Sequence, residues 1–298
     1  MSDDDDYGLY QWSEEELQIP IGRHWKLHRD RLDLLKRVRT YHDEHGTLLV
    51  LKSIDNALLK SAGGPLSTRM ELDILQRLLA ISSSRNHTIP AEIITCSKTS
   101  IIVMPYLREA IIMSWDSLDT LTDVIWQVLQ GLEFMHENGI AHFDVHLDNL
   151  VVCCKPSLPT SLFPVEQSKC YFIDFGSSKQ LPPPPRGGHG DIYIPFLPYG
   201  GHYDPPEGRE RVNPYAYDIY STGQTALYMC KMATFYARRE RDERFRVPPA
   251  LREFCRILAN DDTRMRPTAS RSMMLLRITW RWNKMTQWLY WFAPYHVA

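Results

Sequence analysis

The first hundred residues alternate between short apolar runs and polar turns, a pattern typical of β-strands. The run 47–54, TLLVLKSI, follows the turn-like sequence DEHG and carries Lys52 as its one charge. The segment 34–41 suits the preceding strand of a hairpin, and the runs at 91–96 and 100–104 predict two more strands. We therefore expect a small, strand-rich region in the N-terminal part of the chain.

Helical spacing occurs once in this region and dominates the rest of the chain. Residues 68–80 repeat apolar positions on one helical face and place Glu71 near the start of the predicted helix. Residues 119–138 show the same spacing over a longer stretch, and Gly139 is a typical residue to end a helix. From Asp218 onward the pattern predicts helices nearly to the last residue.

Two segments between these elements predict loops. Residues 155–168 lie between two short predicted strands, contain Pro and Ser, and are interpreted only as a surface loop. Residues 181–206 are rich in Pro and Gly. A loop of that length inside a compact domain is usually either functional or disordered.

Strands with one helix first, followed mostly by helices, predict an α+β protein with two lobes. We expect the chain to divide into a disordered acidic segment, a two-lobed domain and an aromatic-rich segment packed on the larger lobe. The expected bounds are 1–20 for the acidic segment, 21–275 for the domain with lobes over 21–105 and 108–275, and 276–298 for the aromatic segment.

Composition and charge narrow the class of protein. The chain has 298 residues, a formal net charge of −2 and 44% hydrophobic residues, so it can form a sizeable core and shows no charge excess that would favour nucleic acid. It has neither a signal-peptide pattern nor an apolar run long enough to cross a bilayer. The six cysteines include no CxxC pair. We therefore expect an intracellular, cytoplasmic protein with reduced thiols.

Aromatic residues gather near the C-terminus, where polar and charged residues interrupt them: Trp280, Trp282, Trp288, Trp291 and Phe292. We interpret them as packing against the domain. Contact with a partner or with a membrane surface is the alternative interpretation.

The segment most informative about chemistry is 142–149, His-Phe-Asp-Val-His-Leu-Asp-Asn, which follows the long predicted helix. It fits H-x-D-x-x-x-x-N and resembles the catalytic loop of protein kinases. Asp174-Phe175-Gly176 ends a later predicted strand and resembles the metal-binding motif DFG of the same family. Each motif alone would be weak, but the two in this order favour the resemblance over the alternative that Asp144 and Asp174 are ordinary turn residues.

Other segments match the family in the same order. Val50-Leu51-Lys52 is similar to the lysine-bearing V-A-I-K strand, and Glu71 falls on the following helix. Pro205-Pro206-Glu207 resembles A-P-E, Asp218 to Gly223 resembles D-x-W-S-x-G, and Arg266-Pro267-Thr268 resembles a late R-P-T motif. The resemblance covers roughly residues 45 to 275 and implies the bilobal protein-kinase fold, with Glu207 and Arg266 forming a buried ion pair.

The resemblance also implies roles for the side chains of the cleft. Lys52, oriented by Glu71, would hold the phosphates of ATP, and Asp144 would accept the proton of the attacking hydroxyl. Asn149 and Asp174 would supply hard oxygen ligands for Mg²⁺.

The adenine ring of ATP would lie between Val50 and Val151, next to Met104 and the hinge around Tyr106, whose backbone would hydrogen-bond it. The two valines could equally be ordinary residues of core strands, and the two roles are compatible.

The main departure from the family is the loop that covers the phosphates. Ordinary kinases have a G-x-G-x-x-G hairpin before the lysine strand, because glycines let backbone N–H groups approach the phosphates closely. Here no glycine occurs between Trp25 and Gly46, and the sequence HRDRLD at 28–33 fills the expected position. We expect weaker nucleotide affinity or turnover. Arg29 and Arg31 could contact phosphate instead, and a solvated basic turn is the alternative.

Two further departures lie in the catalytic loop. Phe143 replaces the arginine that receives a phosphorylated activation loop in regulated kinases, so we expect activity that does not depend on such phosphorylation. His146 stands where serine/threonine kinases carry lysine, and it resembles the histidine of small-molecule kinases.

Three functions compete on this basis. The first is a divergent protein kinase that transfers the γ-phosphate of ATP to a Ser or Thr hydroxyl of a protein. The second is a pseudokinase that acts by binding a nucleotide or a protein, which the missing glycines favour. The third is a small-molecule phosphotransferase, which His146 alone favours.

Overall fold

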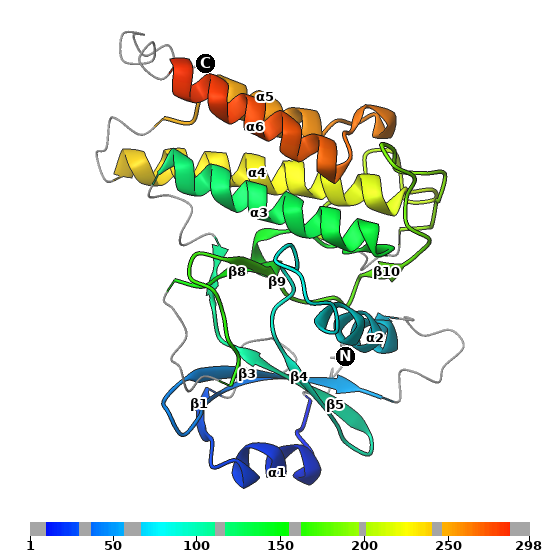
Figure 1. Ribbon diagram of the computed structural model, residues 1–298. Helices are drawn as coiled ribbons and strands as arrows, with labels where there is room; N and C mark the ends of the chain where they lie inside the picture. The colour runs from blue at the N-terminus through cyan, green and yellow to red at the C-terminus, as the bar shows by residue number, and fades with distance from the viewer. Residues whose placement is uncertain are drawn as a thin grey trace, which may run out of the picture.

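The protein has two lobes, seen one above the other in Figure 1. The computed structural model describes residues 10–29, 37–56, 67–110, 117–154, 162–196, 201–239 and 246–286. The smaller lobe is built on a sheet and the larger one on helices, so the expected two-lobed α+β arrangement is confirmed. Within the part of the chain that is described, no helix is both long and apolar enough to span a bilayer.

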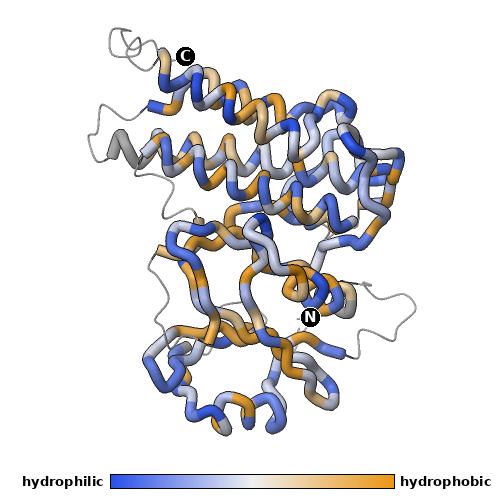
Figure 2. The backbone as a smooth tube through the Cα atoms, viewed as in Figure 1, coloured by the Kyte–Doolittle hydropathy of each residue, from blue (hydrophilic) through white to orange (hydrophobic). Residues whose placement is uncertain are grey.

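The sheet of the small lobe has five antiparallel strands in the order β1-β2-β3-β5-β4. Their bounds are Lys26–Arg29 for β1, Val38–His42 for β2, Leu48–Asp55 for β3, Glu92–Thr95 for β4 and Thr99–Pro105 for β5. The central strands β3 and β5 are the most hydrophobic part of this lobe (Figure 2).

Alternation along β3 determines which side chains reach the cleft. Successive side chains of a strand point to opposite faces. Leu49 and Leu51 belong to an apolar cluster on the outer face, whereas Ile54 packs with Ile74 of α2 (Ser67–Leu79) on the inner face. Lys52 shares the parity of Ile54 and therefore faces inward, toward the large lobe.

The outer face of the sheet is covered by α1 (Glu14–Gly22), which lies on the side opposite α2 (Figure 1). The helix begins with a capping box in which Ser13 and Glu16 bond each other's backbone amides. Glu16 is fully buried and also accepts hydrogen bonds from Tyr10 Oη, at 2.6 Å, and from Ser53 Oγ of β3. Residues 10–20 are therefore an ordered part of the small lobe, whereas 1–9 of the expected acidic segment lie outside the described residues.

The large lobe packs four helices around the main hydrophobic core: α3 (Leu118–Glu137), α4 (Pro214–Arg239), α5 (Pro249–Leu258) and α6 (Ala269–Thr286). Helix α3 contacts both α4 and α6. Helix α6 runs without a break across 275/276, where we expected the domain to end and the aromatic segment to begin. Trp288, Trp291 and Phe292 lie outside the described residues.

Short elements line the junction of the lobes. These are β6 (Arg108–Glu109), β7 (Ile140–Ala141), the 3₁₀ turn Leu147–Asn149, β8 (Leu150–Val152), β9 (Cys170–Phe172) and β10 (Lys179–Gln180). A second 3₁₀ turn, Thr263–Met265, connects α5 to α6 within the large lobe. The segment 142–149 connects two antiparallel strand pairs, β7–β10 and β8–β9.

The insertion between β8 and β9 reaches back to the small lobe. Its described part, residues 162–168, is called the strap below. Phe163 is 6% exposed and belongs to the outer cluster of the sheet, together with Trp12 and Leu49. Val165 and the hinge residue Leu107 pack against the same small apolar cluster, which includes Val151 and Tyr171. The interpretation as a surface loop therefore misses a contact that connects the lobes.

Candidate active site

A lysine of the small lobe connects the two lobes at the cleft. Lys52 Nζ lies 2.7 Å from Glu71 Oε1 on α2 and 3.0 Å from Asp174 Oδ1 of the large lobe. Burial opposes the charge on Lys52, but the adjacent carboxylates raise the pKa of its ammonium group. The amine therefore stays protonated, and the structure brings together these three residues of the prediction.

Asp174 sits in a backbone conformation that points its carboxylate into the cleft. Its φ is 58°, in the left-handed region, and Oδ1 also accepts a hydrogen bond from the amide of Gly176 at 3.2 Å. The charge of Lys52 is the main cause that lowers the pKa of Asp174. With about half of its side chain exposed, this ionised carboxylate remains accessible to a ligand.

The catalytic loop is held by a buried carboxylate of α4. Asp218 is fully buried and accepts hydrogen bonds from the amides of His142, at 2.8 Å, and Phe143, at 2.7 Å, and from His136 Nε2 at 2.9 Å. A buried carboxylate with several donors fixes the groups around it. The loop is thus positioned by α4 and α3.

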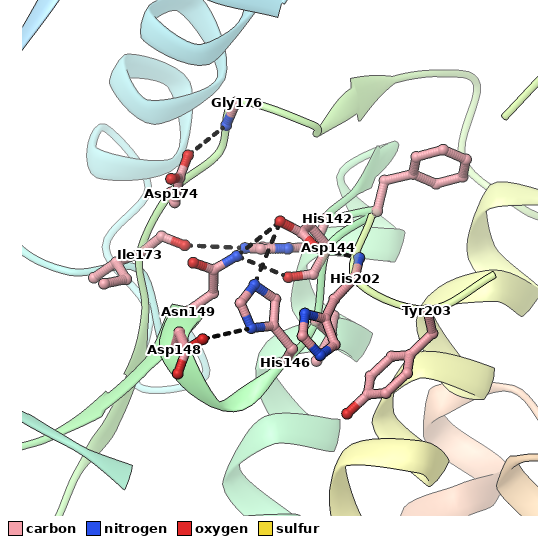
Figure 3. A network of polar contacts seen from close by, with 12 residues as sticks. His142, Asp144, His146, Asp148, Asn149, Ile173, Asp174, Gly176, His202 and Tyr203 are labelled. Atoms are coloured by element: carbon pink, nitrogen blue, oxygen red, sulfur yellow. Dashed lines mark hydrogen bonds and ion pairs between the residues drawn. The ribbon is translucent and has the colours of Figure 1, made fainter. Parts of the chain in front are cut away.

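Asp144 lies at the centre of the network in Figure 3. Its Oδ2 accepts a hydrogen bond from Asn149 Nδ2 at 3.0 Å, and its Oδ1 accepts one from the amide of His202 at 2.8 Å. Burial alone would raise the pKa of Asp144, but His146, His142 and the amide of His202 hold it below its usual value. Asp144 is therefore a carboxylate, as a proton acceptor must be.

A pair of stacked imidazoles flanks this carboxylate. His146 Nε2 lies 3.5 Å from Asp144 Oδ2, and its Nδ1 lies 3.6 Å from Asp148 Oδ2. Burial lowers the pKa of His146, but the two aspartates outweigh burial and raise it above the usual value. The ring of His202 stacks on His146 with a centroid distance of 4.5 Å (Figure 3).

The position of His202 depends on the glycine before it. A side chain at Gly201 would meet Tyr217 Oη at 2.6 Å and the carbonyl oxygen of Phe143 at 2.7 Å. Only glycine lets the segment lie this close to the catalytic loop. No recognised motif contains His202, and sequence reasoning missed it.

An aromatic cluster occupies the space beside Phe143. Phe143 is 1% exposed and lies 5.4 Å from Phe196 and 4.9 Å from Tyr217, measured between ring centroids. Its φ of 66° is unusual for a bulky residue, so the surrounding packing must hold the backbone there. The activation segment is thus attached to the loop by apolar contact at this position.

The segment after this cluster is fixed by the expected ion pair. Arg266 donates to both carboxylate oxygens of Glu207, at 3.1 and 2.7 Å, and its guanidinium lies over the ring of Tyr220. The side chain of Arg266 is fully buried. The predicted contact between Glu207 and Arg266 is confirmed.

The adenine side of the cleft is only partly as expected. Val50 pairs with Met104 across β3 and β5, and Val151 packs in the same cluster as Met104. The amide of Tyr106, however, donates to the carbonyl oxygen of Leu48 at 2.9 Å, so it is not free to bond an adenine ring. The amide of Tyr106 thus belongs to the ladder with β3, and contact of this residue with the base stays a prediction.

The donor set suits a metal ion that arrives with phosphates. No group of three or more His, Cys, Asp or Glu residues suited to a metal ion occurs among the described residues. The side-chain oxygen of Asn149 and the carboxylate of Asp174 are hard oxygen ligands beside the cleft. Mg²⁺ typically binds through one or two such groups and completes its shell with water and phosphate oxygens, so these residues fit it.

The site can be set beside known proteins. A family model described as the protein kinase domain matches residues 36–284. The meiosis-specific serine/threonine-protein kinase MEK1 of Saccharomyces cerevisiae is 28% identical over 102 residues, which are 34% of this chain. The matched part is 18% of that yeast protein, so the chain spans only a small share of its relative's length.

Proposed function

This chain belongs to the protein kinase family, and we propose that it is an active enzyme that transfers the γ-phosphate of ATP to a serine or threonine hydroxyl of a protein. Family membership implies ATP and a protein substrate. The preference for serine or threonine is proposed from the name of the yeast relative.

The observation that carries the proposal is the continuity of the polar network across the cleft. Lys52 contacts both Glu71 and Asp174, and Asp144 contacts Asn149. Phosphoryl transfer needs positioning and charge neutralisation more than covalent work from the protein. A scaffold that had lost its chemistry would not need all of these groups in place.

Each side chain has a role in this proposal. Lys52 binds phosphate oxygens and is oriented by Glu71, and Asp144 orients the substrate hydroxyl and accepts its proton. Asn149 and Asp174 would hold Mg²⁺, which neutralises charge on the phosphates.

The hinge can be assigned by elimination. Pro105 has no N–H to donate, and the amide of Tyr106 is engaged by Leu48. The amide of Leu107 is then the one left within this tripeptide, and we propose it as the donor to the adenine ring.

The pseudokinase alternative is favoured by one observation. The strands β1 and β2, where the phosphate-covering hairpin belongs, contain no glycine, and the connection at 30–36 lies outside the described residues. The third alternative, a small-molecule phosphotransferase, is disfavoured by the Glu207–Arg266 pair, which supports an activation segment of the protein-kinase kind.

Transfer of radiolabelled phosphate from ATP to a mixture of proteins tests the proposal. We expect incorporation with the intact chain and a loss of about a thousandfold in Asp144→Asn, because general acid–base catalysis contributes on that scale. Nucleotide binding should persist in this variant. Equal incorporation by both proteins, or none by either, would establish a binding module instead.

A further inference from the structure

Helix α6 has a second apolar face that no other described part of the chain covers. Its inner face packs on the large lobe through Ala269, Ser272, Met273, Leu276 and Asn283. On the opposite side Met274, Ile278, Trp282 and Met285 follow at spacings of four, four and three residues, which align them along the helix. They are 55%, 57%, 56% and 71% exposed, respectively. We call these four residues the α6 stripe.

Positive charge accompanies the stripe. Arg271 and Arg281 are exposed on the same side of the helix, and no carboxylate of the described residues pairs with either one. Two other cations of α6 are engaged elsewhere, since Arg277 lies over Trp126 and Lys284 bonds Asp119. The sequence from 269 to 298 contains no Asp or Glu.

We propose that the α6 stripe binds an anionic membrane surface, with the helix lying in the plane of the headgroups. A helix with apolar and aromatic residues on one side and arginines beside them is the pattern of interfacial binding. Methionine, isoleucine and tryptophan would enter the boundary of the acyl chains, and Arg271 and Arg281 would contact acidic headgroups.

The α6 stripe could also contact the stripe of a second copy of the chain, but repulsion between the arginines disfavours that contact. Two stripes packed face to face would bring Arg271 and Arg281 of one copy against those of the other, with no acidic residue of α6 to neutralise them. An anionic surface reverses the sign of this interaction.

The position of α6 is compatible with activity at a membrane. Figure 1 shows α6 at the end of the molecule farthest from the sheet of the small lobe. The cleft with Lys52 and Asp144 lies between the lobes, so a surface on α6 leaves it open. The proposal does not depend on catalysis and holds equally for an inactive member of the family.

Flotation of the full chain with lipid vesicles tests this. We expect binding to vesicles of phosphatidylserine with phosphatidylcholine, weak binding to phosphatidylcholine alone, and release by salt. Ile278→Ser should weaken binding about tenfold, because it removes a buried aliphatic side chain from the contact. Ile21→Ser is the matched control, since Ile21 lies on α1 and is 58% exposed.

A second variant keeps the test independent of apolar substitutions. Arg271→Gln with Arg281→Gln should weaken binding about fivefold per arginine while leaving thermal unfolding unchanged. No binding to acidic vesicles, or equal binding by Ile278→Ser and Ile21→Ser, would overturn the proposal. A dimer in light scattering that Ile278→Ser abolishes would also overturn it and assign the stripe to a second copy.

Discussion

The two sides of the cleft differ in how firmly their groups are held. On the large lobe, the amides of His142 and Phe143, in the loop around Asp144, donate hydrogen bonds to the buried Asp218. The side chains of both residues have almost no exposed surface. On the small lobe, residues 26–28 of β1 are exposed at the edge of the sheet, and the pairing with β2 shifts register after Leu27. The loop around Asp144 is therefore held by more contacts than β1, the strand expected to cover the phosphates.

This contrast shows which departures from a family pattern a fold tolerates. A carboxylate that accepts a proton must be placed within hydrogen-bond reach, so its loop needs many fixed contacts. A strand that covers phosphates contributes affinity, and other contacts can replace part of that affinity. Loss of glycines in β1 is thus compatible with an intact network around Asp144.

The largest effect on nucleotide binding is expected from removing the carboxylate of Asp174, which connects the large lobe to Lys52 of the small lobe. Asp174→Asn should abolish the stabilisation by ATP and Mg²⁺, which for a bound nucleotide at a hundredfold excess over Kd is about 2.7 kcal/mol. Thermal unfolding with and without ATP and Mg²⁺ measures this, and omitting Mg²⁺ should have the same effect on the intact protein. A shift that survives in Asp174→Asn would mean that the small lobe alone carries the nucleotide.

The second test removes the ion-pair partner of a charged residue in the large lobe. Arg266→Met should lower the free energy of unfolding by about 3 to 5 kcal/mol, because it leaves Glu207 without its partner. Denaturant unfolding measures the change. The double variant Glu207→Leu with Arg266→Met should lose less than the single one, and an equal loss would show that packing rather than charge is responsible.

The third test concerns the aromatic cluster at Phe143. Phe196→Ala should cost about 3 kcal/mol of stability and lower phosphate transfer, since the cavity loosens the segment that holds His202. Phe196→Leu keeps most of the volume and should retain more activity.

Phosphatase treatment should leave the intact protein active, because Phe143 replaces the arginine that would receive a phosphorylated loop. A treated sample without activity would contradict the role of the cluster.

A smaller effect on the stability of the fold is expected from lowering the pH. Burial lowers the pKa of His189 to about 4, from an ordinary value of 6.5, while its Nε2 bonds the carbonyl oxygen of Arg266 at 3.0 Å. Its neutral form is favoured in the folded state, so stability should fall as pH drops from about 6.5 toward 4. His189→Gln should reduce the loss between pH 7 and pH 5 by up to about 2 kcal/mol. Melting curves with the same pH dependence in both proteins would contradict this.

The smallest effect should come from the covering strand. We expect Arg29→Ala with Arg31→Ala to weaken nucleotide binding by less than about threefold, as for side chains that form a solvated turn. Titration with a fluorescent nucleotide analogue measures it. A tenfold loss would instead show that these arginines replace the missing glycines and that the small lobe holds phosphate firmly.

Much of the fold could be predicted from periodicity. The run at 47–54 corresponds to β3 and the segment 119–138 to α3, because both bury one face that the spacing of apolar residues records. Helix α1 could not be found this way. Its stability comes from the capping box and from Glu16, a buried acid that composition alone places at the surface.

The candidate site divides in the same manner. Lys52, Glu71, Asp144 and Asn149 could be located because a family pattern names them, and the structure brings them to one cleft. His202 could not, because its place depends on the close approach at Gly201, a tertiary contact that no local pattern records. The engaged amide of Tyr106 was missed because ladder bonds at a strand end depend on register.

The strap has a consequence for turnover. Any rotation that parts the lobes must either carry residues 162–168 along with the small lobe or withdraw Phe163 from its cluster. Exposing a phenylalanine to water costs roughly 2 to 3 kcal/mol, which slows a step by about 30- to 160-fold if that energy adds to its barrier. If the chain is active as proposed, the strap would therefore slow the opening that releases the spent nucleotide, and not the chemical step.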